Sequence, residues 1–132
     1  MRKNNLKYFY IISSLIWMGA IFWGSAIADY SVVPGVGEDH NDFLSGTVHI
    51  LSYAILCFLF IKSFIASDLV KNKAIIYGFI LASLYGATDE WHQFFVPGRE
   101  AHLSDWLLDV VGAFLVFSFY KYATIINVGR KH

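Results

Sequence analysis

Several acidic and imidazole side chains stand inside segments that are otherwise apolar. In the segment from Tyr85 to Gln93, three such residues and a glutamine follow closely on one another, namely Asp89, Glu90, His92 and Gln93. At 3.6 residues per turn, Asp89, His92 and Gln93 share one helix face. Glu90 is turned by about 100° from Asp89 and is expected to serve a different contact. This spacing predicts a cluster of titratable groups on one helix.

Two further segments carry polar pairs one helical turn apart. His49 and Tyr53 form one pair, and Asp105 and Asp109 form the other. An acid paired with a histidine can exchange protons near neutral pH, because burial raises the pKa of a carboxyl group and a nearby charge shifts that of an imidazole. Arg99 lies between these segments and can hold a phosphate or carboxylate by two parallel hydrogen bonds. The residue types are therefore those of acid–base chemistry on an anionic substrate.

The elements that position these groups are expected to be transmembrane helices. Of the 132 residues, 57% are apolar and only 15% are charged, which is too little charge to cover a soluble domain of this size. A helix needs about 20 largely apolar residues to cross a bilayer. We predict an all-α, four-helix transmembrane bundle that forms a single domain over residues 1–132. Its spans are expected over residues 8–28, 43–64, 74–95 and 105–122.

The charge distribution predicts the orientation of this bundle. Apart from Arg99, every basic residue falls on one side of a chain that crosses four times: Arg2, Lys3, Lys7, Lys62, Lys71, Lys73, Lys121, Arg130 and Lys131. The positive-inside rule then places both termini in the cytoplasm, for a multi-pass protein of the plasma membrane. His49, Asp89 and Asp109 would each lie roughly 6–9 Å inside the outer boundary. The formal net charge is zero, so no nucleic-acid partner is expected.

The N-terminal segment has a second interpretation, as a signal peptide cleaved after Ala26-Ile27-Ala28. Its apolar run of 21 residues, from Tyr8 to Ala28, is longer than the roughly 7–15 residues of a signal peptide, which favours a retained span.

Structural roles compete with functional ones for several of these side chains. An unpaired charge within a span costs at least about 2.5–3.5 kcal/mol, so such groups usually mark a site. Asp105, however, follows Ser104 at a helix start and can act as a cap, and a buried network of Asp and His can simply hold helices together. Trp91 and Trp106, near span ends, are expected in an interfacial aromatic belt.

The segment Tyr85-Gly-Ala-Thr-Asp-Glu-Trp-His-Gln-Phe-Phe-Val-Pro-Gly-Arg99 is followed by Ser104-Asp105 and by Asp109-Val-Val-Gly112. With His49 and Tyr53 upstream, this pattern resembles the VanZ-like family of small bacterial membrane proteins. That family is named for a member linked to teicoplanin resistance. The resemblance implies a role at the cell envelope that affects susceptibility to glycopeptides, and it implies no settled reaction.

Three classes of function follow from the residues and the resemblance together. The first is a protein that shields the envelope by binding a lipoglycopeptide. The second is a hydrolase or transferase acting on a lipid-linked or peptidoglycan precursor, and the third is a small transporter subunit. The expected partners are the lipid bilayer and one of these lipid-anchored molecules. The candidate catalytic residues are Asp89, His92, Asp109 and His49. The candidate substrate-binding residues are Arg99, Glu90, Gln93, Tyr53 and Asp105.

The prediction includes no cofactor and no metal. An alternative in which the site holds a metal ion draws on carboxylate and imidazole ligands from all three segments, namely His49, Asp89, His92 and Asp109.

Overall fold

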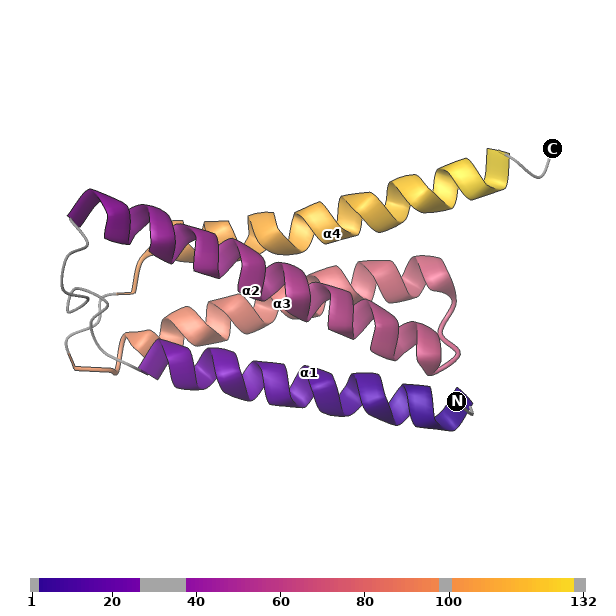
Figure 1. The fold of residues 1–132 in the computed structure, drawn as a ribbon, viewed down its shortest axis with the longest axis horizontal. Helices are drawn as coiled ribbons and strands as arrows, with labels where there is room; N and C mark the ends of the chain where they lie inside the picture. Colours follow the sequence, from indigo (N-terminus) through magenta and orange to yellow (C-terminus); the bar gives the residue numbers. More distant parts are fainter. Residues whose placement is uncertain (1–2, 27–37, 98–100, 130–132) are drawn as a thin grey trace.

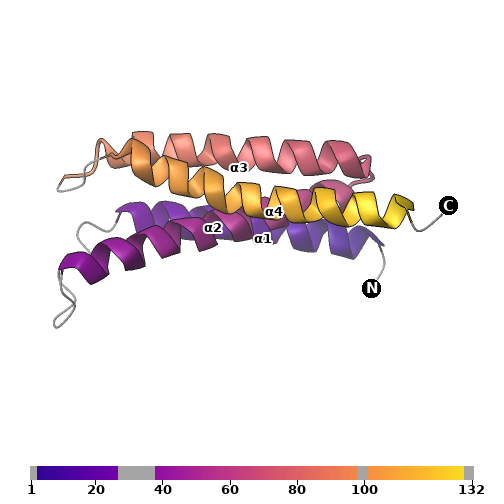
Figure 2. The ribbon, with the colours of Figure 1, turned by 90° about the horizontal axis from the view of Figure 1, so that it is seen from above.

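The computed structural model describes residues 3–26, 38–97 and 101–129, and the side chains of residues 4–26, 45–97 and 101–127. In this part the chain forms four helices: α1 (Lys3–Ala26), α2 (Glu38–Ala66), α3 (Lys71–Gln93) and α4 (Leu103–Gly129). The helices run up and down along a common axis (Figures 1 and 2). The predicted all-helical fold is confirmed. Arg99, Ile27 and Ala28 lie outside the described residues.

The connection between α2 and α3 is closed by hydrogen bonds within the backbone. The amide of Leu69 donates to the carbonyl of Phe64, and the amide of Asp68 donates to that of Ile65. Asp68 itself has a positive φ of 66°. These two bonds and the left-handed residue form a Schellman motif, and aspartate is among the few residues that tolerate that backbone conformation. The chain therefore reverses within a few residues, which makes α2 and α3 antiparallel neighbours.

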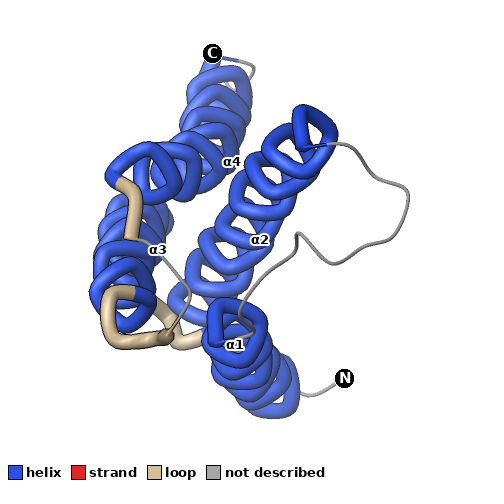
Figure 3. The backbone as a smooth tube through the Cα atoms, turned by 90° about the vertical axis from the view of Figure 1, so that its left-hand side faces the viewer, coloured by secondary structure: helices blue, strands red, loops and turns tan. Residues whose placement is uncertain are grey.

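Helix α2 is the central element of the bundle. It packs against α4, α3 and α1, whereas α1 makes only slight contact with α3. The view along the bundle shows α2 beside each of the other three helices (Figure 3). The buried apolar core draws on α2, α3 and α4 and consists of Tyr53, Leu56, Cys57, Phe60, Ile61, Ile75, Ala82 and Ala113. The three segments that carry the candidate residues are thus also those that share the core.

Three of the described helices are long and apolar enough to cross a membrane. They are α1, α2 and α4, with apolar stretches over Asn4–Ala26, Ser45–Ala66 and Leu103–Asn127. Large apolar side chains project outward from them, as Trp23 does from α1 and Phe119 from α4, at 74% and 68% exposure. These outer surfaces indicate a lipid environment.

Helix α3 was expected to span as well, but its mean hydropathy falls below that of the other three. The physical reason is its buried face, on which every residue except Ile75 is small or polar: Ala74, Ile75, Gly78, Ala82, Gly86, Asp89, Glu90 and Gln93.

Candidate functional site

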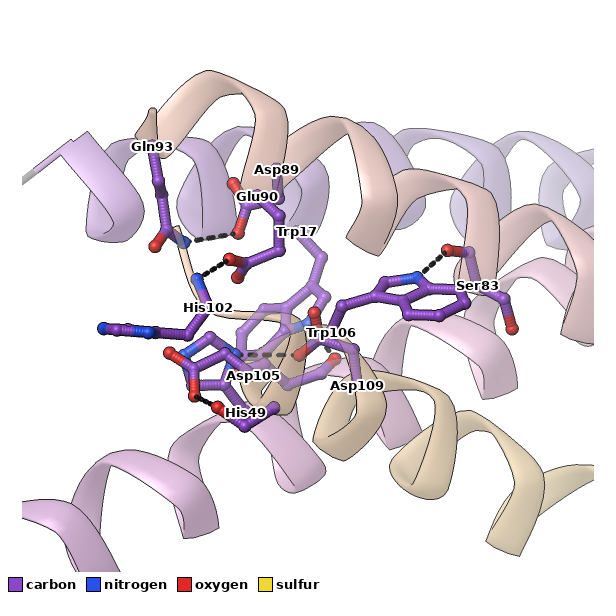
Figure 4. Close-up of polar contacts among 12 residues, drawn as sticks. Trp17, His49, Ser83, Asp89, Glu90, Gln93, His102, Asp105, Trp106 and Asp109 are labelled. Carbon is purple, nitrogen blue, oxygen red and sulfur yellow. Dashed lines mark hydrogen bonds and ion pairs between the residues drawn. The ribbon is translucent and has the colours of Figure 1, made fainter. Parts of the chain in front are cut away.

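A buried histidine–aspartate pair joins α2 to α4. The Nδ1 atom of His49 lies 2.8 Å from Oδ1 of Asp109. The Asp109 side chain is completely buried, and that of His49 is 12% exposed. Both residues were candidates from the sequence, and Figure 4 shows them pointing toward one another. In the described part of the chain, Oδ2 of Asp109 has no hydrogen-bond partner.

Two glycines allow the helices to approach closely enough for this contact. A Cβ atom at Gly112, one turn after Asp109, would overlap the carbonyl oxygen of Ile50, the residue after His49. A Cβ atom at Gly86 of α3 would lie 3.0 Å from Oδ2 of Asp109. Small residues at helix interfaces let backbones come together in membranes. The absence of side chains at these positions is therefore what places Asp109 against both α2 and α3.

Glu90 is the residue of α3 that joins this pair. Its carboxylate lies near the His49 imidazole and the Asp109 carboxylate, and one ligand atom from each residue falls within 4.8 Å of the other two. Its Oε2 atom accepts a hydrogen bond of 3.0 Å from the backbone N–H of His102, while Oε1 has no partner among the described residues. Glu90 is 8% exposed. Glu90, which was expected to serve a different contact from Asp89, is thus a member of the polar cluster.

The reason is that α3 packs on two sides. It contacts both α2 and α4, so the arc of α3 that faces the protein is wider than the 100° between neighbouring residues. Asp89 and Glu90 are therefore both buried.

Asp89 and Gln93 of α3 and Tyr53 of α2 form another side of the cluster. Asp89 is 4% exposed, and the Nε2 atom of Gln93 donates to its Oδ2 over 3.4 Å. The hydroxyl of Tyr53, which is 1% exposed, interacts electrostatically with Asp89 and Asp109. The other carboxylate oxygen of Asp89 has no hydrogen-bond partner in the described part.

Two of the remaining predicted site residues, His92 and Asp105, are not among the residues whose ligand atoms converge. The ring of His92 packs against Phe22 of α1, with 4.2 Å between ring centroids, and His92 is not one of the three residues whose ligand atoms converge. Asp105 stands in the first turn of α4, where it accepts a 3.4 Å hydrogen bond from Ser104 and interacts electrostatically with His49. The position of Arg99 is outside the described residues.

The cluster carries a large excess of negative charge. Four carboxyl groups gather near the same end of α3 and α4: Asp89, Glu90, Asp105 and Asp109. Among the described residues, their one ion pair is the contact between Asp109 and His49. Buried carboxylates are costly unless paired or bound to a metal, so the arrangement favours a cationic ligand or protonated acids.

An open pocket of about 430 Å³ adjoins the cluster. It lies between the end of α3 and the start of α4, and its walls are mostly apolar: Ala87, Trp91, Phe94, Leu103 and Trp106. Glu90 lines this pocket and also belongs to the cluster. A ligand with an apolar chain and a polar head matches this combination.

Two supporting contacts were not evident from the sequence. The N–H that donates to Glu90 belongs to the backbone of His102, and a pattern of side chains does not predict a backbone donor. Trp106, expected in an interfacial belt, is half-buried and donates its indole N–H to the carbonyl of Ser83 over 3.0 Å. That bond ties α4 to α3 one turn from Asp109, whereas Trp91 is 68% exposed, as a belt residue would be.

Comparison with known proteins gives one match. The family described as VanZ/LLP1 matches residues 3–126, which is nearly the whole chain. No curated protein and no solved structure matches. The chain, with its bundle of apolar helices and its polar cluster, belongs to the VanZ/LLP1 family.

Proposed function

We propose that this protein acts at the outer face of the plasma membrane and lowers the susceptibility of the cell to lipoglycopeptides such as teicoplanin. The observation that carries the proposal is the buried His49–Asp109 pair, with Glu90 beside it, at one end of an otherwise apolar bundle. Ionisable groups within membrane helices are costly and are retained where they serve a function. Membership of the VanZ/LLP1 family supports the envelope role.

The proposed topology has four spans and cytoplasmic termini. The described lysines support it, because they stand at the end of the bundle opposite the cluster: Lys7, Lys62, Lys71, Lys73 and Lys121. The positive-inside rule assigns that end to the cytoplasm and the cluster to the outer side.

The exposed face of α3 supports its inclusion as the fourth span. It presents Ile76, Ile80, Leu81 and Leu84, which are between 39% and 58% exposed. The polar residues that lower the mean hydropathy of α3 are buried against the protein instead. Lipid would therefore meet an apolar surface on this helix too.

The proposal is tested by expressing the protein in a teicoplanin-susceptible bacterium. We expect a severalfold rise in the minimum inhibitory concentration of teicoplanin, and a smaller rise for a glycopeptide of the same class without an acyl chain. Asp109→Asn should abolish the rise at unchanged abundance in the membrane, because it removes the charge that pairs with His49. Asp68→Asn, in the α2–α3 connection, is the matched control. Equal protection by the wild type and Asp109→Asn would reject a role for the pair.

A second candidate function is hydrolysis or transfer on a lipid-linked envelope precursor. The specific observation in its favour is that Glu90 lines both the apolar pocket and the polar cluster. An apolar ligand chain in the pocket would then bring its polar head to the carboxylates, where acid–base chemistry is available.

The test is to incubate the protein in nanodiscs with a polyprenyl-linked peptidoglycan precursor and to separate the products by chromatography. Turnover that is lost in Glu90→Gln and kept in Asp68→Asn would favour the enzyme; no turnover in the wild type would favour binding alone.

A further inference from the structure

We infer that His49, Glu90 and Asp109 bind one divalent transition-metal ion of the zinc or manganese class. The three residues come from α2, α3 and α4, and each offers a ligand atom within 4.8 Å of the other two. They are brought together by tertiary packing across 60 residues of sequence rather than by any local motif. Metal binding at this site does not depend on the envelope function proposed above.

The spacing of the donor atoms suits a single ion. Tetrahedral zinc binds imidazole nitrogen and carboxylate oxygen at about 2.0–2.2 Å, so its ligand atoms lie about 3.3–3.6 Å apart. His49 Nδ1 and Asp109 Oδ1 are 2.8 Å apart, and the full set spans no more than 4.8 Å. Side-chain shifts of at most about 1.5 Å would close the site around an ion.

Unpartnered oxygens point independently to a ligand. Asp109 is 0% exposed and its Oδ2 has no hydrogen-bond partner among the described residues; Glu90 is 8% exposed and the same holds for its Oε1. Most buried polar atoms in native proteins have a hydrogen-bond partner, and a buried atom without one is often explained by a bound water or ion. Both atoms belong to residues of the converging set, so an ion bound between these residues would give both carboxylates a further partner.

The charge of the surroundings favours a cation. Asp89 and Asp105 add their charges to those of Glu90 and Asp109, and the described part supplies only His49 as an ion-pair partner. A bound dication would be the largest local positive charge and would offset two of these carboxylates. Neutral imidazole with two carboxylates is a donor set that suits zinc and manganese, whereas calcium and magnesium favour oxygen ligands alone.

The ion would keep at least one open coordination position. Three protein ligands plus a water or substrate oxygen is the arrangement of catalytic zinc sites. Because Glu90 also lines the apolar pocket, a phosphate or carboxylate head of a molecule in that pocket would lie next to the ion.

The structural ligand set differs from the sequence-based alternative. Asp89 and His92 are replaced by Glu90, because His92 packs on Phe22 and Asp89 faces Tyr53. This difference makes the test specific.

The experiment measures metal binding by the full chain, purified without a histidine tag, stripped with a chelator and held in detergent. Titration calorimetry with Zn²⁺ and with Mn²⁺ is expected to show one tight equivalent for at least one ion, and metal analysis after dialysis should agree. Glu90→Gln keeps the size of the side chain and removes its charge, so we expect the affinity to fall at least about tenfold, the loss that even outer-shell changes cause. His49→Gln provides a second ligand variant.

His92→Gln and Asp68→Asn are the matched controls, and both should bind like the wild type. Circular dichroism and size-exclusion chromatography verify that each variant is folded. If Glu90→Gln fails to fold, His49→Gln decides in its place. Absence of binding by the wild type, equal affinity in the folded ligand variants, or an equal loss in His92→Gln would each overturn the site.

Discussion

The two halves of the bundle are held together in different ways. Around Leu56, Cys57 and Phe60, the interior is apolar and closely packed. Around His49, Glu90 and Asp109, it consists of charged groups that leave some buried oxygens without partners. The same three helices build both halves. We conclude that packing in the apolar half stabilises the bundle and offsets the destabilising burial of charged groups in the polar half.

In a lipid environment, the apolar half and the polar half depend on different interactions. Between helices in a membrane there is little hydrophobic driving force, because lipid tails are as apolar as leucine, and association depends on packing and hydrogen bonds. The apolar half therefore depends on dispersion contacts in a filled interior. The polar half depends on close backbone approach, with glycines at Gly86 and Gly112 where the helices meet.

The largest effect on stability is expected in the apolar half. Leu56→Ala removes a side chain that is 0% exposed and should lower the free energy of unfolding by about 2 kcal/mol, the lower end of the usual range, because only packing is lost. Titration with sodium dodecyl sulfate measures this change. Protection against teicoplanin per folded molecule should be unchanged. If Leu56→Ala lost protection while keeping wild-type stability, the apolar half would itself take part in protection, which would contradict this division of roles.

The next effect tests the close approach of α2 and α4. Gly112→Ala places a methyl group against the carbonyl of Ile50 and should cost about 1–2 kcal/mol, within the usual range for overpacking. Gly19→Ala in α1, where nothing lies within 4 Å, is the matched control and should be neutral or slightly stabilising. The same titration compares them. Equal stability of the two variants would contradict a tight α2–α4 contact.

A smaller effect is expected at the tie between α3 and α4. Trp106→Phe removes the hydrogen bond to the carbonyl of Ser83 but keeps most of the ring, so the cost should be about 1 kcal/mol. Trp23→Phe, at a side chain that is 74% exposed, serves as the control. Thermal unfolding in detergent, followed by circular dichroism, gives both values. A lower melting temperature for Trp23→Phe than for Trp106→Phe would reject the tie.

The smallest change in stability should come from the polar half itself. Asp89→Asn preserves the shape of the side chain and relieves repulsion from Glu90, so the free energy of unfolding should change by less than about 1 kcal/mol. Protection against teicoplanin should nevertheless be lost. Asp89→Asn protein that is scarce in the membrane would instead make Asp89 a structural residue.

Sequence patterns were informative where a property is local. The long apolar runs predict α1, α2 and α4, and the acids within spans point to one end of the bundle. His49 and Asp109 were both candidates, and the structure places them in contact. Averaged hydropathy is less informative for α3, because its polar residues are buried and its exposed side is apolar.

The sequence by itself determined the helices, their apolar character and which segments carry charge, because these follow from the composition of one continuous stretch of about 20 residues. Only the tertiary structure decided that Glu90 joins His49 and Asp109 while His92 packs on Phe22. Neighbouring residues of α3 face different helices, so their partners depend on which helices pack on each side. The close approach of these helices depends on Gly86 and Gly112, and a glycine has this effect only where a second helix packs against it.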